Sequence, residues 1–295
     1  MKQIHCSIGV LAYNESANIA KLLNALKSQK TEHIVIDEII VVSSASSDGT
    51  DEIVKEFCDD KIKLISEPER KGKSAAINTF IKAVKSEVLV IESGDTIPAE
   101  DTVELMVAPF LNPETGMTGG RPLPENDDKS FVGYSVNLLW RLHHKMAMIS
   151  PKLGEMVAFR RVFESIPDKS AVDEASIEAL IKEKGLKLKY VPEAIVHNKG
   201  PENIRDFILQ RRRIETGHLW LKKNQNYEVI SQDSGILLKI SLNEIMKDPK
   251  NVIRFTGTML MEIYSRFLGW FDFNIKKKNP FKWDIATSTK NLEHK

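Results

Sequence analysis

An acidic turn directly after an apolar run is the first place in this sequence where chemistry could occur. Residues 88–101 have the sequence VLVIESGDTIPAED, in which Asp95 follows closely on the apolar residues VLVI. A carboxylate at this point either ends a strand and faces water, or holds a divalent cation against a phosphate. Carboxylate oxygens suit Mg²⁺ or Mn²⁺, which usually bind through one or two carboxylates together with substrate phosphates.

Polar stretches also follow three other apolar runs, at residues 12–15, 43–44 and 67–70. In an open α/β sheet, ligands bind outside the carboxyl ends of the strands. If the four runs are strands of one parallel sheet, their polar ends meet at one edge. We therefore expect a binding site there that includes Asp95.

Strand and helix alternate four times in about the first 95 residues. The predicted elements, in chain order, span residues 4–12, 16–28, 38–44, 47–58, 61–67, 73–86 and 87–93, beginning and ending with a strand. This alternation predicts a parallel sheet with helices on both faces. Near-continuous apolar runs such as IIVV and VLVI are typical of strands that are covered on both sides.

The rest of the chain is less regular. Residues 113–130 mix Pro, Gly, Asn and Asp and predict a loop. The elements predicted after it are a helix at 130–150, a strand at 155–163, a helix at 173–185, a strand at 186–192, and a helix or bent helix pair at 204–223. The last seventy residues are predicted to be helical. We therefore expect one domain at 1–223 and a helical extension at 224–295.

Bulk properties exclude several classes of protein. The chain has 295 residues and a net charge of +1, so no global field favours nucleic acid as a partner. The N-terminus is too polar for a signal peptide. The nearest candidate for a membrane span, residues 252–273, is interrupted by Arg254, Glu262 and Arg266. We expect a cytoplasmic protein, either free or peripheral on the inner face of the cell membrane.

Two common nucleotide-binding motifs are absent. The turn after the first predicted strand, AYNESANI, has no glycine, whereas a dinucleotide fold needs G-x-G-x-x-G there. Gly72, Lys73 and Ser74 imitate the end of a P-loop, but no glycine stands five residues before Gly72. Neither a Rossmann dinucleotide site nor a P-loop is therefore predicted.

Six short blocks resemble family-2 glycosyltransferases, in the order and at about the spacing found in that family. They are LAYNESANI, SSASSDGTDEI, ERKGKSAAIN, VIESGDTIP, VDEASIEALIKEKGLKLKYVPEAIVHNKGP and QRRRI, and they cover about residues 4–220. The family comprises inverting, nucleotide-sugar-dependent enzymes. QRRRI is similar to the Gln-x-x-Arg-Trp motif of the hyaluronan, chitin and cellulose synthase branch.

This resemblance implies an α/β, Rossmann-like GT-A domain with a mostly parallel central sheet at 1–223. It implies a nucleoside diphosphate sugar as donor, a glycan or a lipid-linked molecule as acceptor, and Mg²⁺ or Mn²⁺ as cofactor. The residues that it implies at the nucleotide are Ala12, Tyr13, Asn14, Glu15, Ser44, Lys73, Ser93, Gly94 and Asp95. Many members carry acids that bond a uracil ring where Ser43 and Ser44 stand here, so the nucleobase is left open.

The metal site is implied by the same resemblance. Ser93-Gly94-Asp95 aligns with the family's Asp-x-Asp motif, of which only the second acid is present. One acid suffices if the diphosphate supplies the other ligands. His197, in the sequence IVHNKGP, is either a second ligand or an ordinary loop histidine.

The catalytic base is expected at Asp173 and Glu174, the start of a predicted helix. Acids there also interact favourably with the helix dipole, which is the alternative explanation. The family has these two acids in the opposite order, so the sequence leaves open which of them takes the proton from the acceptor hydroxyl.

A third group of residues is implied at the diphosphate and the acceptor: Trp140, Gly154, Glu155, Gln210, Arg212 and Arg213. The alternatives are that Trp140 packs in a core and that the arginines form a solvated helix face. Ile214 stands where the synthase motif has Trp, which argues against processive synthesis.

The C-terminal region mixes apolar residues at helical spacing with aromatics and the run 276–278 of lysines. It predicts either an interfacial membrane contact or a helix docked on the catalytic domain. The function predicted first is an inverting glycosyltransferase. The alternative is a non-catalytic nucleotide-sugar-binding module, and metal-dependent release of nucleoside diphosphate would distinguish the two.

Overall fold

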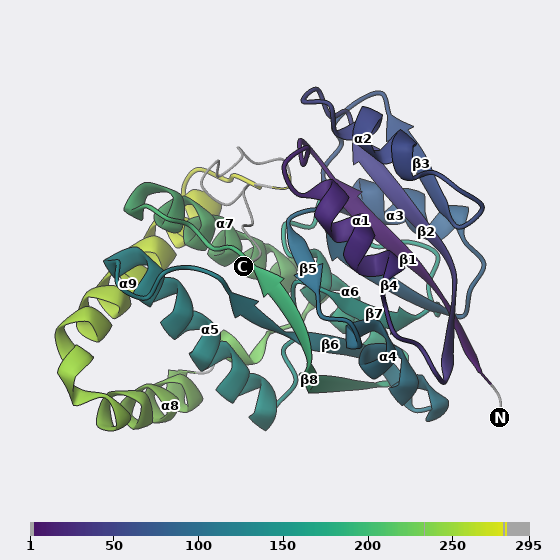
Figure 1. Ribbon diagram of the computed structural model, residues 1–295. Coiled ribbons are helices and arrows are strands. Elements are labelled where there is room, and N and C mark those ends of the chain that lie inside the picture. Colours follow the sequence, from purple (N-terminus) through teal and green to yellow (C-terminus); the bar gives the residue numbers. More distant parts are fainter. Residues whose placement is uncertain (1–2, 233, 280, 282–295) are drawn as a thin grey trace.

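The chain forms a single eight-stranded sheet flanked by helices, in a computed structural model that describes residues 3–232, 234–279 and 281 (Figure 1). The strand order is β3-β2-β1-β4-β7-β6-β8-β5. The strands are β1 (Ile4–Ala12), β2 (Ile34–Ser44), β3 (Ile62–Glu67), β4 (Val88–Ser93), β5 (Thr96–Pro98), β6 (Thr115–Pro124), β7 (Val157–Arg160) and β8 (Lys187–Asn198).

The N-terminal half of the sheet is parallel, as the alternation of strands and helices predicts. β1 pairs in parallel with β2 and β4, and β2 pairs in parallel with β3. β7 adds antiparallel to β4, and β5 adds antiparallel to β8. The carboxyl ends of β1, β2, β3 and β4 therefore meet at one edge of the sheet.

Two apolar cores lie on opposite faces of the sheet. Alternate residues divide between them: Val10 and Val41 pack with one core, and Leu11 and Val42 with the other. The first face is covered by α1 (Ile19–Lys27), α2 (Thr50–Phe57) and α4 (Thr102–Val107), and the second by α3 (Lys73–Ala83) and α6 (Asp173–Glu183). This double cover explains why the strands are apolar without alternation.

The prediction of a loop at 113–130 is wrong, because most of this segment is β6 (Thr115–Pro124). Its glycines allow close packing: a Cβ on Gly119 would lie 2.7 Å from the Leu153 side chain, and one on Gly120 would lie 2.7 Å from the Ala194 carbonyl oxygen. The composition resembles that of a turn, but the glycines are present because this strand is closely packed on both sides.

The strand predicted at 186–192 continues through Pro192 to Asn198 as β8. The pairing of β8 with β6 shifts register between Gly119 and Arg121, where Tyr190 and Ile195 are the respective partners. Pro192 lies inside this irregular segment, where its missing N–H costs no regular ladder bond. The longer strand changes the expected positions of the residues that follow Pro192.

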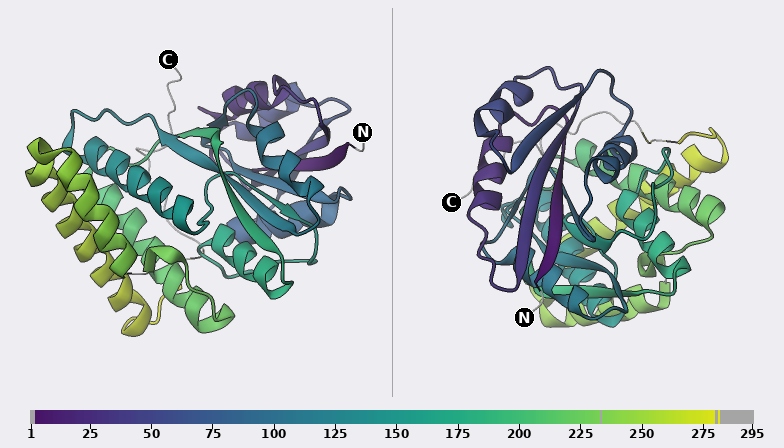
Figure 2. Two further views of the ribbon diagram at one scale, coloured as in Figure 1. Left: turned by 90° about the horizontal axis from the view of Figure 1, so that it is seen from below. Right: turned by 90° about the vertical axis from the view of Figure 1, so that its right-hand side faces the viewer.

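The C-terminal helices are docked on the rest of the chain (Figure 2). Residues 204–223, predicted as a helix or a bent pair, form one helix, α7 (Ile204–Gln225). Beyond it lie η2 (Ile230–Gln232), α8 (Ser234–Lys247), η3 (Pro249–Asn251) and α9 (Val252–Asn274). Ile240 of α8 and Phe255 of α9 share a core with α5 (Phe131–Ile149), which follows η1 (Ala108–Leu111) and β6. The domain division at residue 223 stays a prediction.

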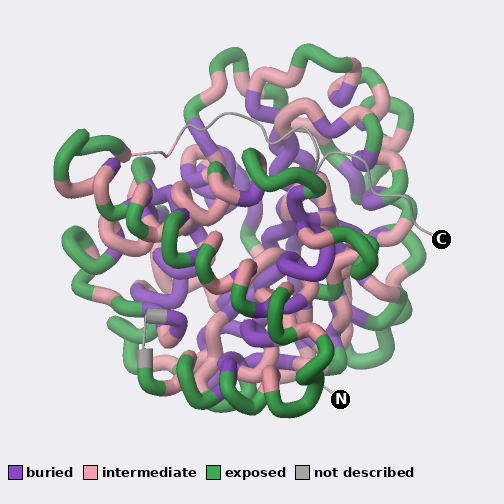
Figure 3. Tube along the Cα trace, turned by 90° about the vertical axis from the view of Figure 1, so that its left-hand side faces the viewer, coloured by how far each residue is buried: buried purple, intermediate pink, exposed green. Residues whose placement is uncertain are grey.

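Ion pairs join α7 and α9. Arg211 donates two hydrogen bonds of 2.7 Å to Glu262, and Arg212 donates to Asp272, at 2.6 Å for one of its two bonds. The acids of α9 are thus directed toward α7. Exposed and buried segments alternate along the outer helices (Figure 3). None of the helices in the described part of the chain is sufficiently long and apolar to cross a membrane.

Candidate functional site

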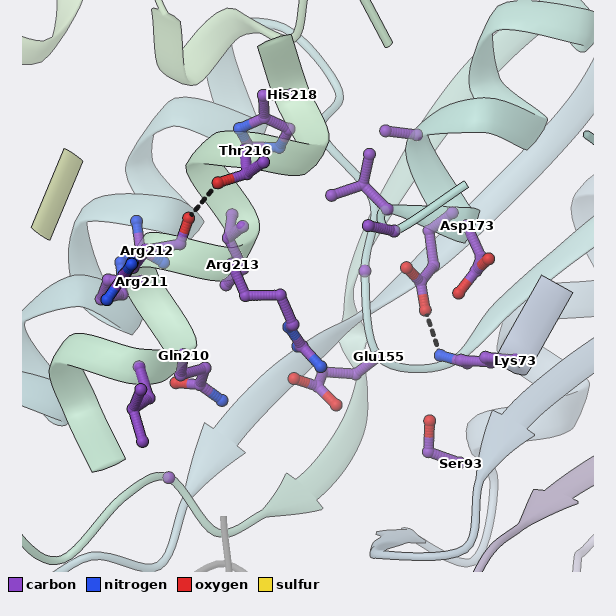
Figure 4. Close-up of a pocket in the computed structure, with 18 of the residues that line it drawn as sticks. Lys73, Ser93, Glu155, Asp173, Gln210, Arg211, Arg212, Arg213, Thr216 and His218 are labelled. Atoms are coloured by element: carbon purple, nitrogen blue, oxygen red, sulfur yellow. Dashed lines mark hydrogen bonds and ion pairs between the residues drawn. The ribbon is translucent and has the colours of Figure 1, made fainter. Parts of the chain in front are cut away.

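A cavity of about 820 Å³ lies at the carboxyl ends of the parallel strands. Ala12, Ser44 and Ser93, the last residues of β1, β2 and β4, all line it. Residues of α5, α7 and the start of α6 complete the lining, and the α7 side chains lie on the side away from Ser93 and Lys73 (Figure 4). The structure therefore brings three of the four predicted strand ends directly to one site, and the fourth contributes Arg70 from the loop after β3.

The turn after β1 lines the cavity through Tyr13 and Glu15, but not through Asn14. The guanidinium of Arg70 lies 4.0 Å from the centre of the Tyr13 ring, so a cation covers the aromatic face. Asn14 has a left-handed backbone, with φ of 54°, and its side chain accepts a hydrogen bond of 2.9 Å from the Ser47 backbone. Asn14 therefore holds the loop after β2 against the turn.

Gly94 acts through its small size. A Cβ on Gly94 would lie 2.6 Å from the Glu15 side chain, and the Gly94 N–H donates to the Leu11 carbonyl at 3.0 Å. Only glycine lets the turn after β4 approach the turn after β1 this closely. The motif Ser93-Gly94-Asp95 thus combines two cavity-lining side chains with a contact that fixes their position.

Two acids of the cavity, Asp95 and Glu155, come from different elements. Glu155 follows α5 in a left-handed conformation with φ of 61°, and both Glu155 and Gly154 line the cavity. Burial and the nearby Asp95 carboxylate together raise the pKa of Glu155 to about 7, against the effect of Lys73. The electrostatics of this part of the cavity thus favour a cation.

The predicted metal site depends on the acids of this cavity. Among the described residues, no three His, Cys, Asp or Glu side chains converge as an ion-binding group. Asp95 and Glu155 fit a cation that takes its remaining ligands from a substrate diphosphate, as Mg²⁺ commonly does. The residues present therefore fit Mg²⁺ or Mn²⁺ shared with a substrate, but not a site made by protein alone.

His197 is not brought to this site. Asn198, the last residue of β8, lines the cavity, whereas His197 does not. Successive residues of a strand point to opposite faces, and the His197 ring has its Nδ1 3.7 Å from a Glu125 carboxylate oxygen. Asn198, and not His197, therefore contributes the side chain of this strand end to the cavity.

Asp173 and Glu174, the two candidates for the catalytic base, begin α6. Both are bonded to the first residues of α3. Lys73 Nζ lies 2.6 Å from a Glu174 carboxylate oxygen, marked by the dashed line at Lys73 in Figure 4, and Ser74 donates a hydrogen bond to Asp173. Asp173 is 1% exposed as a residue, whereas the Glu174 side chain is 19% exposed. Glu174 is thus the more accessible acid.

The two carboxyl groups also differ in pKa. Burial raises the pKa of Asp173, and Lys73 only partly offsets this. Burial acts in the same direction on Glu174, but the adjacent Lys73 ammonium outweighs it and lowers the Glu174 pKa. The same acids raise the pKa of Lys73 despite its burial.

Three consecutive arginines of α7 point in three directions, as the 100° step of a helix requires. Arg213 reaches into the cavity toward Glu155 (Figure 4), and its surroundings include Asp173, Glu174 and Asp95. Arg212 was expected at the diphosphate, but its guanidinium is bound to Asp272 of α9. Gln210 also lines the cavity, and its likeness to the Gln of the synthase motif stays a prediction.

The cavity extends between the helices beyond Trp140, which lines it as predicted. Sequence analysis missed most of the residues at this inner end because they come from separate loops and helices: Lys152, His218, Ser231, Glu262 and Arg266. The weak signal that existed was the apolar spacing of 252–273, which carries Glu262 and Arg266 on the docked side of α9.

Comparison with known proteins identifies the family. The model of "Glycosyl transferase family 2" matches residues 7–170, more than half of the chain, and the chain belongs to this family. The chain is 34% identical over 119 residues to glycosyltransferase AglE of Haloferax volcanii, a match covering 39% of this chain and 38% of AglE. It is 27% identical over 237 residues to the probable glycosyltransferase YdaM of Bacillus subtilis, covering 74% and 55% of the two chains. These matches span about half or less of the two relatives.

Solved structures confirm the GT-A fold. The mannosyltransferase PcManGT of Pyrobaculum calidifontis, in complex with GDP-Man and Mn²⁺, aligns with a TM-score of 0.60 and 21% identity, covering 98% of this chain and 84% of its own. Glucosyl-3-phosphoglycerate synthase of Mycobacterium tuberculosis, in complex with Mn²⁺ and UDP, gives a TM-score of 0.53 and 16% identity, covering 77% and 82%.

Proposed function

We propose that this chain is an inverting glycosyltransferase that moves a sugar from a nucleoside diphosphate sugar to an acceptor hydroxyl. The observation that carries this proposal is one cavity with two chemically different sides. Asp95, which follows β4, lines it together with the ionised Glu174, which is bound to Lys73, and Arg213 reaches in from α7 on the other side (Figure 4). The solved relatives bound to nucleotides and Mn²⁺ support a donor of this class.

The donor would lie along the strand ends. Tyr13 with Arg70 offers a stacking surface for a nucleobase, and Lys73 and Arg213 supply positive charge for the diphosphate. A divalent cation, when held by Asp95 and the diphosphate, would stabilise the negative charge that develops on the leaving group. Arg213 sits among four acids, so a bound diphosphate would compete with them for its guanidinium.

We assign the general base to Glu174. Its carboxylate takes the proton of the acceptor hydroxyl while that oxygen forms a bond to the anomeric carbon. The bond from this carbon to the diphosphate oxygen breaks at the opposite side, and the nucleoside diphosphate leaves with the bonding electrons. Attack from the side opposite to the leaving group inverts the anomeric centre. Asp173 is a positioning residue, held by Ser74 behind Lys73 and Glu174.

A donor screen tests the proposal. The protein is incubated with Mn²⁺ or Mg²⁺ and a panel of UDP-, GDP- and dTDP-sugars, and nucleoside diphosphate release is recorded with and without EDTA. We expect metal-dependent turnover of one donor. Absence of nucleotide binding in calorimetry with metal present would contradict the proposal. Tight binding without turnover across a panel of glycan and lipid acceptors would favour the non-catalytic binding module.

We further propose that the outer surface of α8 and α9 contacts an anionic membrane. On α9, Ile253, Leu260, Ile263, Phe267 and Trp270 are spaced at helical steps, and each is at least 45% exposed. All acids of these two helices turn inward: Glu244 to α5, and Glu262 and Asp272 to α7. The outer surface is therefore apolar and basic, with exposed lysines at 239, 247, 276 and 277, which complements anionic lipid.

Vesicle co-sedimentation checks this surface. Phe267 and Trp270 stack on it with ring centres 6.2 Å apart, so the double change Phe267→Ser/Trp270→Ser is expected to weaken binding to phosphatidylglycerol vesicles by roughly tenfold or more. Leu111→Ser, which alters a side chain 58% exposed on η1, is the matched control. Equal sedimentation of both variants and the wild type would contradict the proposal. Concentration-dependent association without lipid would instead assign the surface to a second copy of the chain.

A further inference from the structure

The inner end of the cavity carries an excess of buried positive charge. Lys152, from the loop between α5 and β7, lines the cavity together with Arg211 of α7 and Arg266 of α9. Glu262 is the carboxylate that the two arginines share: it accepts 2.7 Å bonds from Arg211 and a 2.8 Å bond from Arg266. Three cations against one cavity-lining carboxylate leave net positive charge in a site largely removed from bulk water.

Lys152 is the least compensated of these cations. Its ammonium donates a 2.8 Å hydrogen bond to the Ser231 hydroxyl, a neutral group, and makes no ion pair with any residue in the described part of the chain. The acids that raise its pKa are Glu178 and, with a smaller effect, Glu262, and Glu178 is already engaged in accepting hydrogen bonds from the Leu153 N–H and the Tyr227 hydroxyl. Burial lowers the pKa of Lys152 to about 8, so that the ammonium still prevails at pH 7.

Two neutral histidines adjoin this charge. Burial lowers the pKa of His143 to about 3, and it also lowers that of His218 far below the usual value. The Nδ1 atom of His143 is buried and has no hydrogen-bond partner among the residues at 3–232, 234–279 and 281. A buried ring nitrogen without a partner is costly unless a ligand or an ordered water satisfies it.

An apolar wall completes the inner end. Leu142 and Met146 of α5, Leu237 of α8 and Met259 of α9 line the same cavity and belong to the core that these helices share. Trp140 lies edge-on to the His143 ring, with centres 5.1 Å apart. A ligand that fits here must therefore present an anionic group to Lys152 and an apolar part to the helices.

We propose that the inner end of the cavity binds the acceptor, and that the acceptor carries a phosphate or carboxylate group, bound by Lys152 and the arginines, joined to an apolar portion. This inference rests on the proposed transfer to an acceptor, and it adds the chemical class of that acceptor. Charge-assisted bonds inside a low-dielectric site are strong and orienting. The anionic group would thus fix the acceptor while its hydroxyl faces Glu174 in the same cavity.

Calorimetry with small probes tests the proposal on the full chain. n-Hexyl phosphate, hexanol and inorganic phosphate are titrated into the wild type, Lys152→Met, Lys152→Arg and Lys82→Met, the last altering an exposed lysine of α3. We expect hexyl phosphate to bind more tightly than either other probe. Its affinity should fall at least tenfold in Lys152→Met, remain largely intact in Lys152→Arg, and be unchanged in Lys82→Met. Replacing an incompletely paired buried cation by an apolar residue is compatible with folding.

A separate titration with nucleoside diphosphate and Mn²⁺ keeps the two proposals apart. Lys152→Met should bind nucleotide as the wild type does, because the Lys152 ammonium is bonded to Ser231 of η2 and to no residue at the strand ends. If the wild type binds no nucleotide, the proposed transferase function is contradicted, whereas the proposed anion site is not. Equal affinity of hexyl phosphate for the wild type and Lys152→Met, or affinity for inorganic phosphate or hexanol as high as for hexyl phosphate, would overturn the anion site.

Discussion

Replacing Asp95 with asparagine is expected to lower kcat/KM for the donor by about 10³-fold, with little loss of folding stability. The side chain keeps its size but loses the charge that would bind a cation against the diphosphate. Charge stabilisation of a leaving group in this way typically contributes several kcal/mol, and about 1.4 kcal/mol corresponds to each tenfold change in rate. The effect should be large because, among the described residues, no cluster of three potential ligands could replace Asp95.

The measurement is donor turnover at varied Mn²⁺ concentration for the wild type, Asp95→Asn and Asp101→Asn. Asp101 is exposed at the start of α4 and serves as the matched control. The residual activity of Asp95→Asn should no longer depend on Mn²⁺. Unchanged Mn²⁺ dependence in this variant would show that the cation, if used, is held elsewhere.

His197→Ala extends the same experiment. Since His197 does not line the cavity, the Mn²⁺ concentration for half-maximal turnover should match that of the wild type. A marked increase would restore the alternative in which His197 is a metal ligand.

The fold and the strand-end half of the site could be predicted because their signals are local. Asp95, Tyr13 and Ser44 each follow their own apolar strand directly, and parallel pairing brings such ends together without further information. The order of the family blocks points to the same residues. In this region the order of strands along the chain is sufficient to place their ends at one edge of the sheet.

The helical half of the site could not be predicted in the same way. Which of Arg211, Arg212 and Arg213 turns toward Glu155 depends on acids that lie 51 and 60 residues further along the chain, at Glu262 and Asp272. Those partners bind two of the arginines and leave Arg213 directed inward. Lys152 had no sequence signal at all, because its importance comes from the helices that enclose it.

Register decided the remaining differences. The predicted strand at 186–192 ended at Pro192, yet β8 continues past an irregular pairing and exposes Asn198 rather than His197 to the cavity. A shift of one residue exchanges the two faces of a strand. Sequence position alone could therefore suggest a histidine ligand that the register excludes from the cavity.

Glu174→Gln is expected to reduce kcat by about 10²–10⁴-fold, the usual contribution of a general base, while nucleotide affinity stays near that of the wild type. Glutamine keeps the shape but cannot accept the acceptor's proton. Asp173→Asn is the matched comparison from the same helix turn. Asp173 is buried and bound by Ser74. Its replacement should therefore disturb the position of Glu174 and Lys73 and lower kcat by about tenfold, less than the loss of the base itself.

The pH dependence of kcat/KM separates the two acids independently of the mutations. A general base must be deprotonated, so activity rises with pH through its pKa. With Glu174 as base, the acidic limb should lie below the ordinary glutamate value of 4.5, because Lys73 lowers the pKa of this carboxyl. With Asp173 as base, the limb should instead lie at about 6, since burial raises its pKa. A limb near pH 6 together with a larger loss in Asp173→Asn would transfer the assignment to Asp173, and Glu174 would then be the partner that holds Lys73 in place.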